Sequence, residues 1–562
     1  NSSLPKTITR SNFVAMAYTI ADLIEHAVDL MPERVALESD GTSRTYSELE
    51  RRSNALAHKL REVGVKPGDR VGLYSRNTIE SVEAMVAIFK ARAVMVNVNY
   101  RYVESELEHI FTDSGMSVLI HERQYCERVC NTLPKAPDLR HRIVIDDGTE
   151  TDLRCAGYSD AIRFEDAIAE SPGERDFEER SSDDLYMLYT GGTTGRPKGV
   201  VWRQEDIWRV LGGGIDWFNS EPVTDEWKLA RDGADGGQLV RFPIPPFIHG
   251  GSQWAIFQSL FGGGKAVVYP EFSGSAAWEI VARHGVNVIF ITGDAMGRPM
   301  IEALAENPDL DLSSVVTVAS SAALFSPSVK EQFLDRFPNA IVIDAIGSSE
   351  TGFGGLGVVA KGAPHTGGPR VKADSETHVL RDDGTRVEPG SGEVGMLART
   401  GHIPLRYHND PEKSAKTFKE FDGVRYSLPG DFAQLEADGT ITMLGRGSVS
   451  INTGGEKVFP EEVEGALKAH PDVFDTVVVG IADDRWGQRV AAVIATRDGA
   501  RPTLDELNDV VRKELAGYKC PRSVWFVDEI KRSPAGKPDY RWGASITAER
   551  PADEAHAPSG RH

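Results

Sequence analysis

Residues 71–120 read VGLYSRNTIE SVEAMVAIFK ARAVMVNVNY RYVESELEHI FTDSGMSVLI. Short apolar runs alternate in this stretch with longer amphipathic segments, and the same alternation returns over residues 287–346. Strand-length and helix-length segments in alternation are typical of β-α-β units around a mostly parallel sheet. The sequence therefore predicts an α/β fold whose large domain spans residues 18–444. The predicted strands are Val71–Tyr74, Val94–Val98 and Val118–Ile120, and the predicted helices are Ile79–Ala91 and Val103–Phe111.

The pattern changes at Leu444-Gly-Arg-Gly-Ser-Val449, where glycines interrupt the periodicity. Shorter strands and helices follow, which indicates a separate small α+β domain over residues 450–548. The intervening residues 445–449 are predicted to form a hinge. Two terminal segments are set apart from the fold: residues 1–17 as a tag or disordered leader, and the Pro-, Ala- and acid-rich residues 549–562 as a disordered tail.

The charge balance limits the partners of the chain. Its 562 residues include 63 basic and 84 acidic side chains, for a formal net charge of −21. A surface this acidic repels a phosphate backbone, which argues against nucleic acid as a partner. No run approaches the ~20 apolar residues of a membrane span, and the first residues lack a signal pattern. We expect no integral membrane segment and a cytoplasmic location, with peripheral membrane contact and a homodimer left open.

Four cysteines, Cys126, Cys130, Cys155 and Cys520, are too few and too irregularly spaced to form a disulfide framework in a chain of this size. We therefore expect reduced thiols. Cys126 and Cys130 stand four residues apart and would share a helix face, but no metal site is expected there.

The strongest chemical signal is Tyr189-Thr-Gly-Gly-Thr-Thr-Gly-Arg-Pro-Lys-Gly-Val200. Its glycines allow close approach of the backbone to a ligand, its threonines supply hydroxyl donors, and Lys198 supplies a positive charge. Together these groups can wrap phosphate oxygens. The loop is not a Walker A sequence, because Pro197 precedes the lysine and Gly199 follows it. The predicted nucleotide contacts are Thr190, Gly191, Gly192, Thr193, Thr194 and Lys198.

This loop resembles the signature of the adenylate-forming superfamily of acyl-CoA synthetases, peptide-synthetase adenylation domains and luciferases. Members of that superfamily share a large N-terminal domain and a small mobile C-terminal domain. Further motifs that resemble theirs follow in order over residues 185–540. The resemblance implies an acid–thiol ligase that uses ATP, Mg²⁺ and coenzyme A. Such an enzyme forms an acyl-adenylate and then transfers the acyl group to the CoA thiol.

Ile346-Gly-Ser-Ser-Glu-Thr-Gly352 follows an apolar strand, and α/β sheets bind ligands at such strand ends. It resembles the superfamily segment whose glutamate helps to hold Mg²⁺ on the nucleotide, which assigns this metal role to Glu350. One carboxylate together with substrate phosphates is a usual arrangement for magnesium. The same segment implies nucleotide contacts for Ser348 and Ser349. Many members stack an aromatic residue on adenine just before the glycine; here the residue is Ile346, so an apolar contact is expected.

Tyr426-Ser-Leu-Pro-Gly-Asp-Phe432 resembles the superfamily's T-G-D segment, with Pro429 in place of the threonine. Asp431 matches the residue that accepts hydrogen bonds from both ribose hydroxyls, which a carboxylate can do. Arg446 matches an arginine that also reaches the ribose and phosphates. At the pivot, where members have Asp or sometimes Lys, this chain has Val449. No side-chain role is therefore assigned to the hinge.

Two motifs lie in the predicted small domain. Thr453-Gly-Gly-Glu-Lys-Val458 resembles the segment that faces the pantetheine channel once the small domain has turned. Arg532-Ser-Pro-Ala-Gly-Lys537 places a lysine on a Pro/Gly turn, and it matches the superfamily lysine that contacts the α-phosphate and the acyl carboxylate. Lys537 is accordingly assigned a catalytic role. The implied CoA contacts are Gly454, Gly455, Glu456 and Lys457.

The acid is indicated only by resemblance. Pro245-Pro-Phe-Ile-His-Gly-Gly251 matches the position of the acyl-pocket motif, which places His249 in the catalytic set beside the carboxylate; a histidine satisfied in the core fits nearly as well. Strings such as Gly347-Ser-Ser-Glu-Thr-Gly-Phe-Gly-Gly355 resemble actinobacterial synthetases that activate steroid side-chain carboxylates in sterol breakdown. The resemblance implies a 3-oxocholest-4-en-26-oate-type acid. A medium- or long-chain fatty acid, or acylation of a separate carrier protein, stays open.

Overall fold

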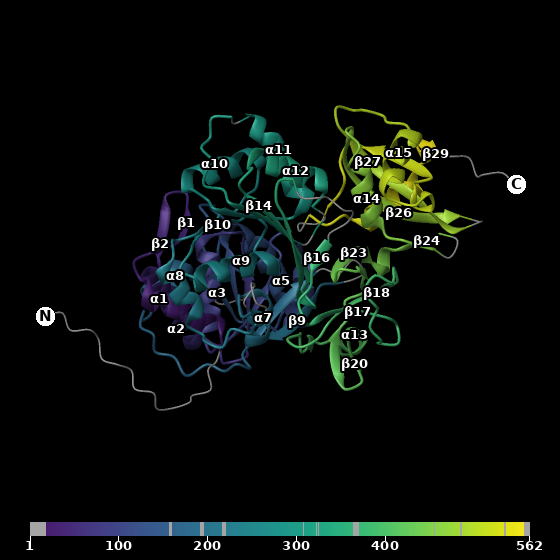
Figure 1. The fold of residues 1–562 in the computed structure, drawn as a ribbon. Helices are drawn as coiled ribbons and strands as arrows, with labels where there is room; N and C mark the ends of the chain where they lie inside the picture. The colour runs from purple at the N-terminus through teal and green to yellow at the C-terminus, as the bar shows by residue number, and fades with distance from the viewer. Residues whose placement is uncertain are drawn as a thin grey trace, which may run out of the picture.

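The computed structural model describes residues 18–156, 160–190, 196–215, 221–306, 308–321, 323, 325–362, 370–453, 456–483, 486–532 and 536–555. For Arg446, Ser448, Glu456 and Lys457 it describes the backbone alone. Figure 1 shows a large domain, coloured from purple to green, and a smaller domain beside it that is coloured yellow-green to yellow. The predicted arrangement of a large α/β domain followed by a small C-terminal domain is confirmed.

A parallel sheet forms around the stretch 71–120. Its elements are β3 (Arg70–Tyr74), α3 (Ile79–Lys90), β4 (Val94–Asn97), α4 (Glu104–Ser114), β5 (Val118–Glu122), α5 (Cys126–Thr132), β6 (His141–Ile145), β7 (Ile162–Arg163) and α6 (Phe164–Ala169). The strand order is β4-β3-β5-β6-β7, and each adjacent pair is parallel. Helix α3 begins at Ile79 because the Thr78 side chain accepts a hydrogen bond from the Ser81 backbone N–H. The predicted β-α-β units are confirmed here.

A second, mixed sheet extends across the large domain. In spatial order it contains β2 (Thr42–Thr45), β1 (Val35–Ser39), β11 (Lys265–Val267), β10 (Val240–Pro243), β12 (Val288–Ile291), β13 (Thr317–Ser321), β14 (Ile341–Ser348), β15 (Gly352–Val359), β16 (Arg370–Lys372), β23 (Thr440–Arg446), β22 (Asp431–Leu435), β18 (Val394–Arg399), β21 (Val424–Ser427) and β20 (Phe418–Phe421), with β17 (Thr377–Leu380) on β18. Neighbours from β1 to β14 are parallel, and those from β14 onward are antiparallel. Only residues 349–351 join β14 to β15, which is too short for a parallel crossover.

A layer of helices lies between the two sheets. It contains α1 (Ile20–Leu30), α2 (Tyr46–Glu62), α3 and α9 (Gly250–Phe261), which share one hydrophobic core. Phe257 of α9 meets Phe89 of α3 and Trp254 edge-on, with ring centroids 5.8 and 5.3 Å apart. Aromatic pairs in this geometry add to the stabilisation from burial. The core therefore fixes α9, the helix that follows His249.

The remaining elements of the large domain surround that core. A small antiparallel sheet has the order β19 (Arg406–Tyr407), β9 (Lys198–Arg203) and β8 (Leu185–Thr190). Helices α10 (Gly274–His284), α11 (Gly293–Glu306) and α12 (Pro327–Arg336) lie together at the top of Figure 1, next to the small domain. The other helices are α7 (Gln204–Leu211), α8 (Lys228–Asp235) and α13 (Pro411–Thr417).

The small domain is built on one sheet. Its elements are β24 (Ile451–Thr453), β25 (Glu456–Val458), α14 (Pro460–Leu467), β26 (Val473–Asp483), β27 (Gly487–Thr496), α15 (Leu504–Glu514), β28 (Ser523–Val527), α16 (Tyr540–Glu549) and β29 (Glu554–Ala555). Strand β29 pairs with β28, with Ser523 opposite Ala555. The prediction of a disordered tail is therefore wrong for residues 554–555. Residues 1–17 and 556–562 lie outside the described residues.

The cysteines differ from the prediction. Cys130 and Cys155 form a disulfide with their Cα atoms 5.1 Å apart, so the expectation of reduced thiols is wrong for this pair. The two residues are 25 positions apart in the sequence, and only the fold of the segment after β6 brings them together. Cys126 and Cys520 are buried free thiols. No helix among the described residues is long and apolar enough to cross a membrane.

Candidate functional site

A cavity of about 230 Å³ opens where the two sheets and the small domain meet. Its polar end lies at the carboxyl ends of neighbouring parallel strands: Thr292 follows β12, Ser321 ends β13 and Ser348 ends β14. Ligands of open α/β sheets bind at this kind of edge. Its apolar wall is large and aromatic, and it is formed by Tyr186, Leu188, Trp202, Ile207, Leu211 and Trp254. The cavity therefore combines a polar end with a wall that suits a bulky hydrophobic group.

The predicted phosphate loop lies at one side of this cavity. Thr190, the last residue of β8, lines it, whereas Gly191, Gly192, Thr193 and Thr194 lie outside the described residues. The Lys198 ammonium forms an ion pair with the Asp410 carboxylate. Lys198 is not among the residues that line the cavity. In this structure Lys198 is therefore paired with Asp410 outside the lining of the cavity.

The turn that carries Glu350 is held from three directions. The Tyr407 hydroxyl donates to Glu350 Oε1 at 2.7 Å, and the Ser427 hydroxyl donates to the Glu350 backbone carbonyl at 2.5 Å. The Trp202 indole N–H donates to the Ser349 carbonyl at 3.0 Å. Ser348 and Ser349 both line the cavity. The turn is thus a fixed part of its polar end.

The side chains around Glu350 indicate whether a magnesium ion could bind there. Among the described residues, no group of three or more His, Cys, Asp or Glu side chains could hold a metal ion by itself. Tyr407 occupies one carboxylate oxygen of Glu350. Magnesium is commonly held by one or two carboxylates with substrate phosphates and water. Glu350 therefore fits Mg²⁺ when phosphate oxygens supply further ligands.

Asp431 and Arg446 are brought together by strand pairing. They are directly opposite each other in the β22–β23 register. The side chain of Arg446 is outside the described part of the structure, and Asp431 does not line the cavity. Their shared nucleotide contact stays a prediction, and the structure shows that their backbones are neighbours.

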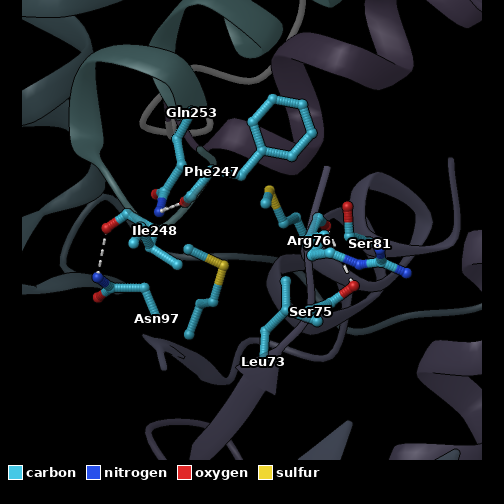
Figure 2. A pocket seen from close by; sticks show the side chains of 10 residues that line it. Leu73, Ser75, Arg76, Ser81, Asn97, Phe247, Ile248 and Gln253 are labelled. Atoms are coloured by element: carbon cyan, nitrogen blue, oxygen red, sulfur yellow. Dashed lines mark hydrogen bonds between the residues drawn. The ribbon is translucent and has the colours of Figure 1, made fainter. Parts of the chain in front are cut away.

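His249 stands on a loop that polar side chains hold in place. Figure 2 shows Asn97 and Gln253 donating to the backbone carbonyls of Ile248 and Phe247, at 2.7 and 2.6 Å. Asn97 also exchanges hydrogen bonds with the backbone of Tyr189, with its amide donating at 2.9 Å and its carbonyl accepting at 2.7 Å. One buried amide therefore couples the His249 loop to the end of β8.

The imidazole of His249 is uncharged. Burial lowers the pKa of His249 to about 3, and the positive charges of Lys537 and Arg101 act in the same direction. Its Nε2 is buried and has no hydrogen-bond partner within the described residues. Because His249 lines the cavity, this nitrogen is available to a bound ligand. The alternative of a histidine satisfied in the core is not supported.

Lys537 reaches the cavity from the other domain. It lines the polar end together with His249 and Thr292. The preceding residue, Gly536, has a φ of +69°, and a Cβ there would lie 2.9 Å from the Ala295 Cβ and 3.2 Å from the Thr292 Cγ2. Only glycine allows the turn to approach α11 this closely without strain. The small domain is therefore docked with its lysine at the site.

The predicted CoA contacts lie elsewhere on the small domain. Gly454 and Gly455 lie outside the described residues, and only the backbone of Glu456 and Lys457 is described. The latter two belong to β25, which pairs with β24. None of the described residues of 451–458 lines the cavity. In this structure Lys537 lines the cavity, whereas no described residue of the predicted CoA segment does.

Sequence analysis did not predict several residues of the site. Asn97 lies within the predicted strand Val94–Val98 and is the last residue of β4, where a polar residue is not by itself unusual. Tyr407 lies 57 residues from its partner Glu350, and nothing local connects the two. The aromatic wall residues Trp202 and Trp254 have the periodicity of ordinary core positions. A buried asparagine at the carboxyl end of a parallel strand was the one usable signal.

Comparison with known proteins identifies relatives over almost the whole chain. The chain is 63% identical to the 3-oxocholest-4-en-26-oate–CoA ligase of Rhodococcus rhodochrous, over 96% of this chain and 98% of that protein. It is 57% identical to the medium/long-chain-fatty-acid–CoA/3-oxocholest-4-en-26-oate–CoA ligase of Mycolicibacterium smegmatis, over 96% of this chain and 98% of that protein. A crystal structure of the anthranilate CoA ligase AuaEII in complex with anthranoyl-AMP is similar in fold, with a TM-score of 0.82 at 22% identity over 96% of this chain and 99% of that one.

Family comparison covers both domains. Residues 24–403 match the AMP-binding enzyme family, and residues 462–537 match the AMP-binding enzyme C-terminal domain. The two matched segments correspond to the large domain with its cavity and to the small domain up to the lysine that faces it. The chain therefore belongs to the AMP-binding enzyme family.

Proposed function

We propose that the protein is an AMP-forming acid–thiol ligase that activates a steroid side-chain carboxylate of the 3-oxocholest-4-en-26-oate type. The observation that carries the chemistry is the meeting of Lys537, from the small domain, with the polar strand ends of the large domain in one cavity. The substrate is supported by 63% identity to a ligase named for that acid. The aromatic and aliphatic wall of the cavity is compatible with a hydrophobic body on the acid.

In the first half-reaction, a carboxylate oxygen of the acid attacks the α-phosphorus of ATP. The bond from the α-phosphorus to the bridging oxygen breaks, and pyrophosphate leaves with the electron pair. Charge accumulates on the phosphate oxygens, and the Lys537 ammonium is placed to stabilise it. Neutral His249 lines the same cavity, and its buried Nε2, which has no hydrogen-bond partner among the described residues, would donate to or accept from the carboxylate or the adenylate. Thr190, Ser348 and Ser349 contribute polar contacts around the nucleotide.

The rest of the nucleotide would lie along the rim of the cavity. Asp431 would accept hydrogen bonds from the ribose hydroxyls, with Arg446 opposite it on the neighbouring strand. Glu350, oriented by Tyr407, would hold Mg²⁺. Bound magnesium supplies positive charge at the phosphate oxygens. The phosphate loop, with Lys198, would contact the phosphate oxygens.

In the second half-reaction, the sulfur of CoA attacks the carbonyl carbon of the acyl-adenylate. The bond from that carbon to the phosphate oxygen breaks, AMP leaves with the electron pair, and the thiol proton passes to solvent. No nucleophilic side chain of the enzyme is needed, because the mixed anhydride is already activated. The segment with Gly454, Gly455, Glu456 and Lys457 would face the incoming pantetheine after the small domain has turned.

A second candidate substrate is a medium- or long-chain fatty acid. It is favoured by the 57% identical relative, whose name includes both kinds of acid. An apolar wall accepts a flexible chain as well as a ring system. The two kinds of acid would compete for one cavity. The ratio of their kcat/KM values therefore decides which is the preferred substrate.

The test is a panel assay with the purified chain, ATP, Mg²⁺ and CoA. Pyrophosphate release and acyl-CoA mass are measured with steroid side-chain acids and with straight-chain acids of increasing length. Higher kcat/KM with the steroid acids supports the proposal. Higher kcat/KM with straight chains leaves the ligase chemistry and overturns the steroid assignment. Adenylate without acyl-CoA from any acid indicates transfer to a carrier protein instead.

A further inference from the structure

A row of charged side chains crosses the contact between the two domains. Its members come from the first turn of α11, the end of α14, strand β26 and the hairpin that carries Lys537, and we call them the ionic relay: Asp294, Lys468, Asp475 and Arg532. The Lys468 Nζ is 3.5 Å from Asp294 Oδ2, across the domain contact, and 3.1 Å from Asp475 Oδ1. Asp294 is 3% exposed and Lys468 is 4% exposed. The contact is therefore a buried one, in which charge pairing is little screened by salt.

The relay continues to the backbone next to the catalytic lysine. Arg532 binds the Asp475 carboxylate with its Nε, at 2.7 Å, and with its Nη2. Its third nitrogen, Nη1, donates to the backbone carbonyl of Gly536 at 2.7 Å. A planar guanidinium that makes all three bonds has one orientation. The carbonyl directly before Lys537 is thus fixed by the relay.

The large-domain end of the relay is equally fixed. The Ser326 backbone N–H donates to Asp294 Oδ1 at 2.8 Å, and Arg298 Nε lies 3.4 Å from Asp294 Oδ2. Helix α11 begins directly after Thr292, which lines the cavity. The same few residues of the large domain therefore carry the docking carboxylate and the wall that Gly536 approaches.

The lowered pKa of Asp475 favours a charged and paired ionic relay at neutral pH. Burial by itself would raise the pKa of Asp475, but Lys468 and Arg532 outweigh burial and lower the pKa to about 2. Asp475 is consequently ionised whenever its two cationic partners are charged. Removing one cation leaves a buried carboxylate without full compensation, which strongly disfavours the docked arrangement.

We propose that the ionic relay transmits the docking of the small domain on α11 to the Lys537 turn, and so positions the lysine for the adenylation half-reaction. Its members are positioning residues, since none of them lines the cavity. This inference rests on the proposed role of Lys537. A relay of this kind affects adenylation selectively, because the second half-reaction does not use the lysine.

The test compares two ion pairs that both cross the domain contact. Asp294→Asn removes the carboxylate that Lys468 meets. Glu302→Gln is the matched control, because it removes the Arg497 Nη1 to Glu302 Oε1 pair of 2.7 Å, which is exposed and does not involve the described residues of the Lys537 hairpin. The full-length proteins are assayed for ATP–pyrophosphate exchange and, separately, for thioester formation from supplied acyl-adenylate. We expect Asp294→Asn to lower the exchange kcat about tenfold or more with little change in KM, and Glu302→Gln to stay within about twofold in both assays.

Two further variants separate positioning from general stability. Lys468→Arg keeps the charge and should restore most of the exchange rate that Lys468→Met loses. In a Lys537→Ala background, Asp294→Asn should cause no further loss of exchange, because both changes then act on one step. Equal loss of both half-reactions, or full additivity with Lys537→Ala, overturns the relay. If Asp294→Asn does not fold, the Lys468 pair and its combination with Lys537→Ala decide the same question.

Failure of the proposed function has a different signature. If wild-type protein forms no adenylate, or if Lys537→Ala keeps the wild-type exchange rate, the role of the lysine is wrong. If Lys537→Ala loses exchange but Asp294→Asn and Lys468→Met keep it, only the relay is wrong. The two outcomes are read from the same set of assays.

Discussion

Replacing Lys537 with alanine is the most direct test of the active site. The side chain enters the cavity from a hairpin of the small domain, beside His249. It belongs to no hydrophobic core cluster, so its removal leaves no hole in a packed interior. We expect the free energy of unfolding to change by no more than ~0.5 kcal/mol, as for ordinary surface substitutions.

The expected loss in adenylation is much larger. A well-placed donor that meets developing charge in a water-poor site contributes about 10² to 10³ in rate, or roughly 3 to 4 kcal/mol. The lysine is close enough to His249 to lower its pKa further below the usual value, together with burial. Thioester formation from supplied acyl-adenylate should stay within about threefold, because that step develops charge on the leaving AMP without the lysine.

The assay measures ATP–pyrophosphate exchange and thioester formation separately on one preparation. Lys531→Ala is the matched control, since Lys531 lies on the same hairpin, is 65% exposed and does not line the cavity. It should behave as wild type in both assays. Equal losses of both half-reactions in Lys537→Ala, or a wild-type exchange rate, would refute the reasoning.

Three further predictions address the turn, the wall and the small-domain interior. Gly536→Ala should lower exchange about five- to thirtyfold, with thioester formation retained, because the added Cβ meets Ala295 at 2.9 Å and the φ of +69° disfavours a side chain. Leu211→Trp should raise KM for steroid acids about tenfold or more while a short acid such as hexanoate is unaffected, because it fills the apolar wall; equal effects on both acids would count against that wall as the acyl site. Burial, with the nearby Glu464 carboxylate, raises the pKa of Glu461 to about 8. Above pH ~4.5 the folded state therefore binds more protons than the unfolded state. Because of this difference, the free energy of unfolding falls as the pH rises toward 8. Glu461→Gln cannot ionise, and its melting temperature should fall less than that of wild type between pH 5 and pH 8.5; an identical decline would contradict this.

Part of the fold could be predicted from the local periodicity of apolar residues. The β-α-β units around β3 to β5 follow from strand-length and helix-length periodicity, and the Thr78 cap marks the start of α3. The antiparallel half of the large sheet could not be predicted in the same way. The brevity of connections such as residues 349–351 is the local feature that indicates antiparallel pairing there.

Contacts between distant segments account for what the sequence missed at the site. Lys198 reads as a phosphate contact from its loop, yet its partner Asp410 lies 212 residues away. Asn97 couples Tyr189 to Ile248 across 92 and 151 residues. The Cys130–Cys155 disulfide likewise depends on the path of the segment after β6. Residue types and spacing give the chemistry that a site could perform, but the packing of the domains decides which side chains meet.

The domain contact also bears on how the two half-reactions are ordered. Lys537 and the segment 453–458 belong to the same small domain, yet the lysine lines the cavity in this arrangement and the described residues of the segment do not. On the proposed function, one orientation therefore cannot serve both steps, and the domain must turn after adenylation. Turning breaks the buried pair between Lys468 and Asp294, while Val449 offers no charge at the hinge to hold either orientation. We infer that the choice of orientation rests on the docking contact instead of the hinge side chain, so a charge introduced at Val449 should alter the balance of half-reactions less than loss of Asp294.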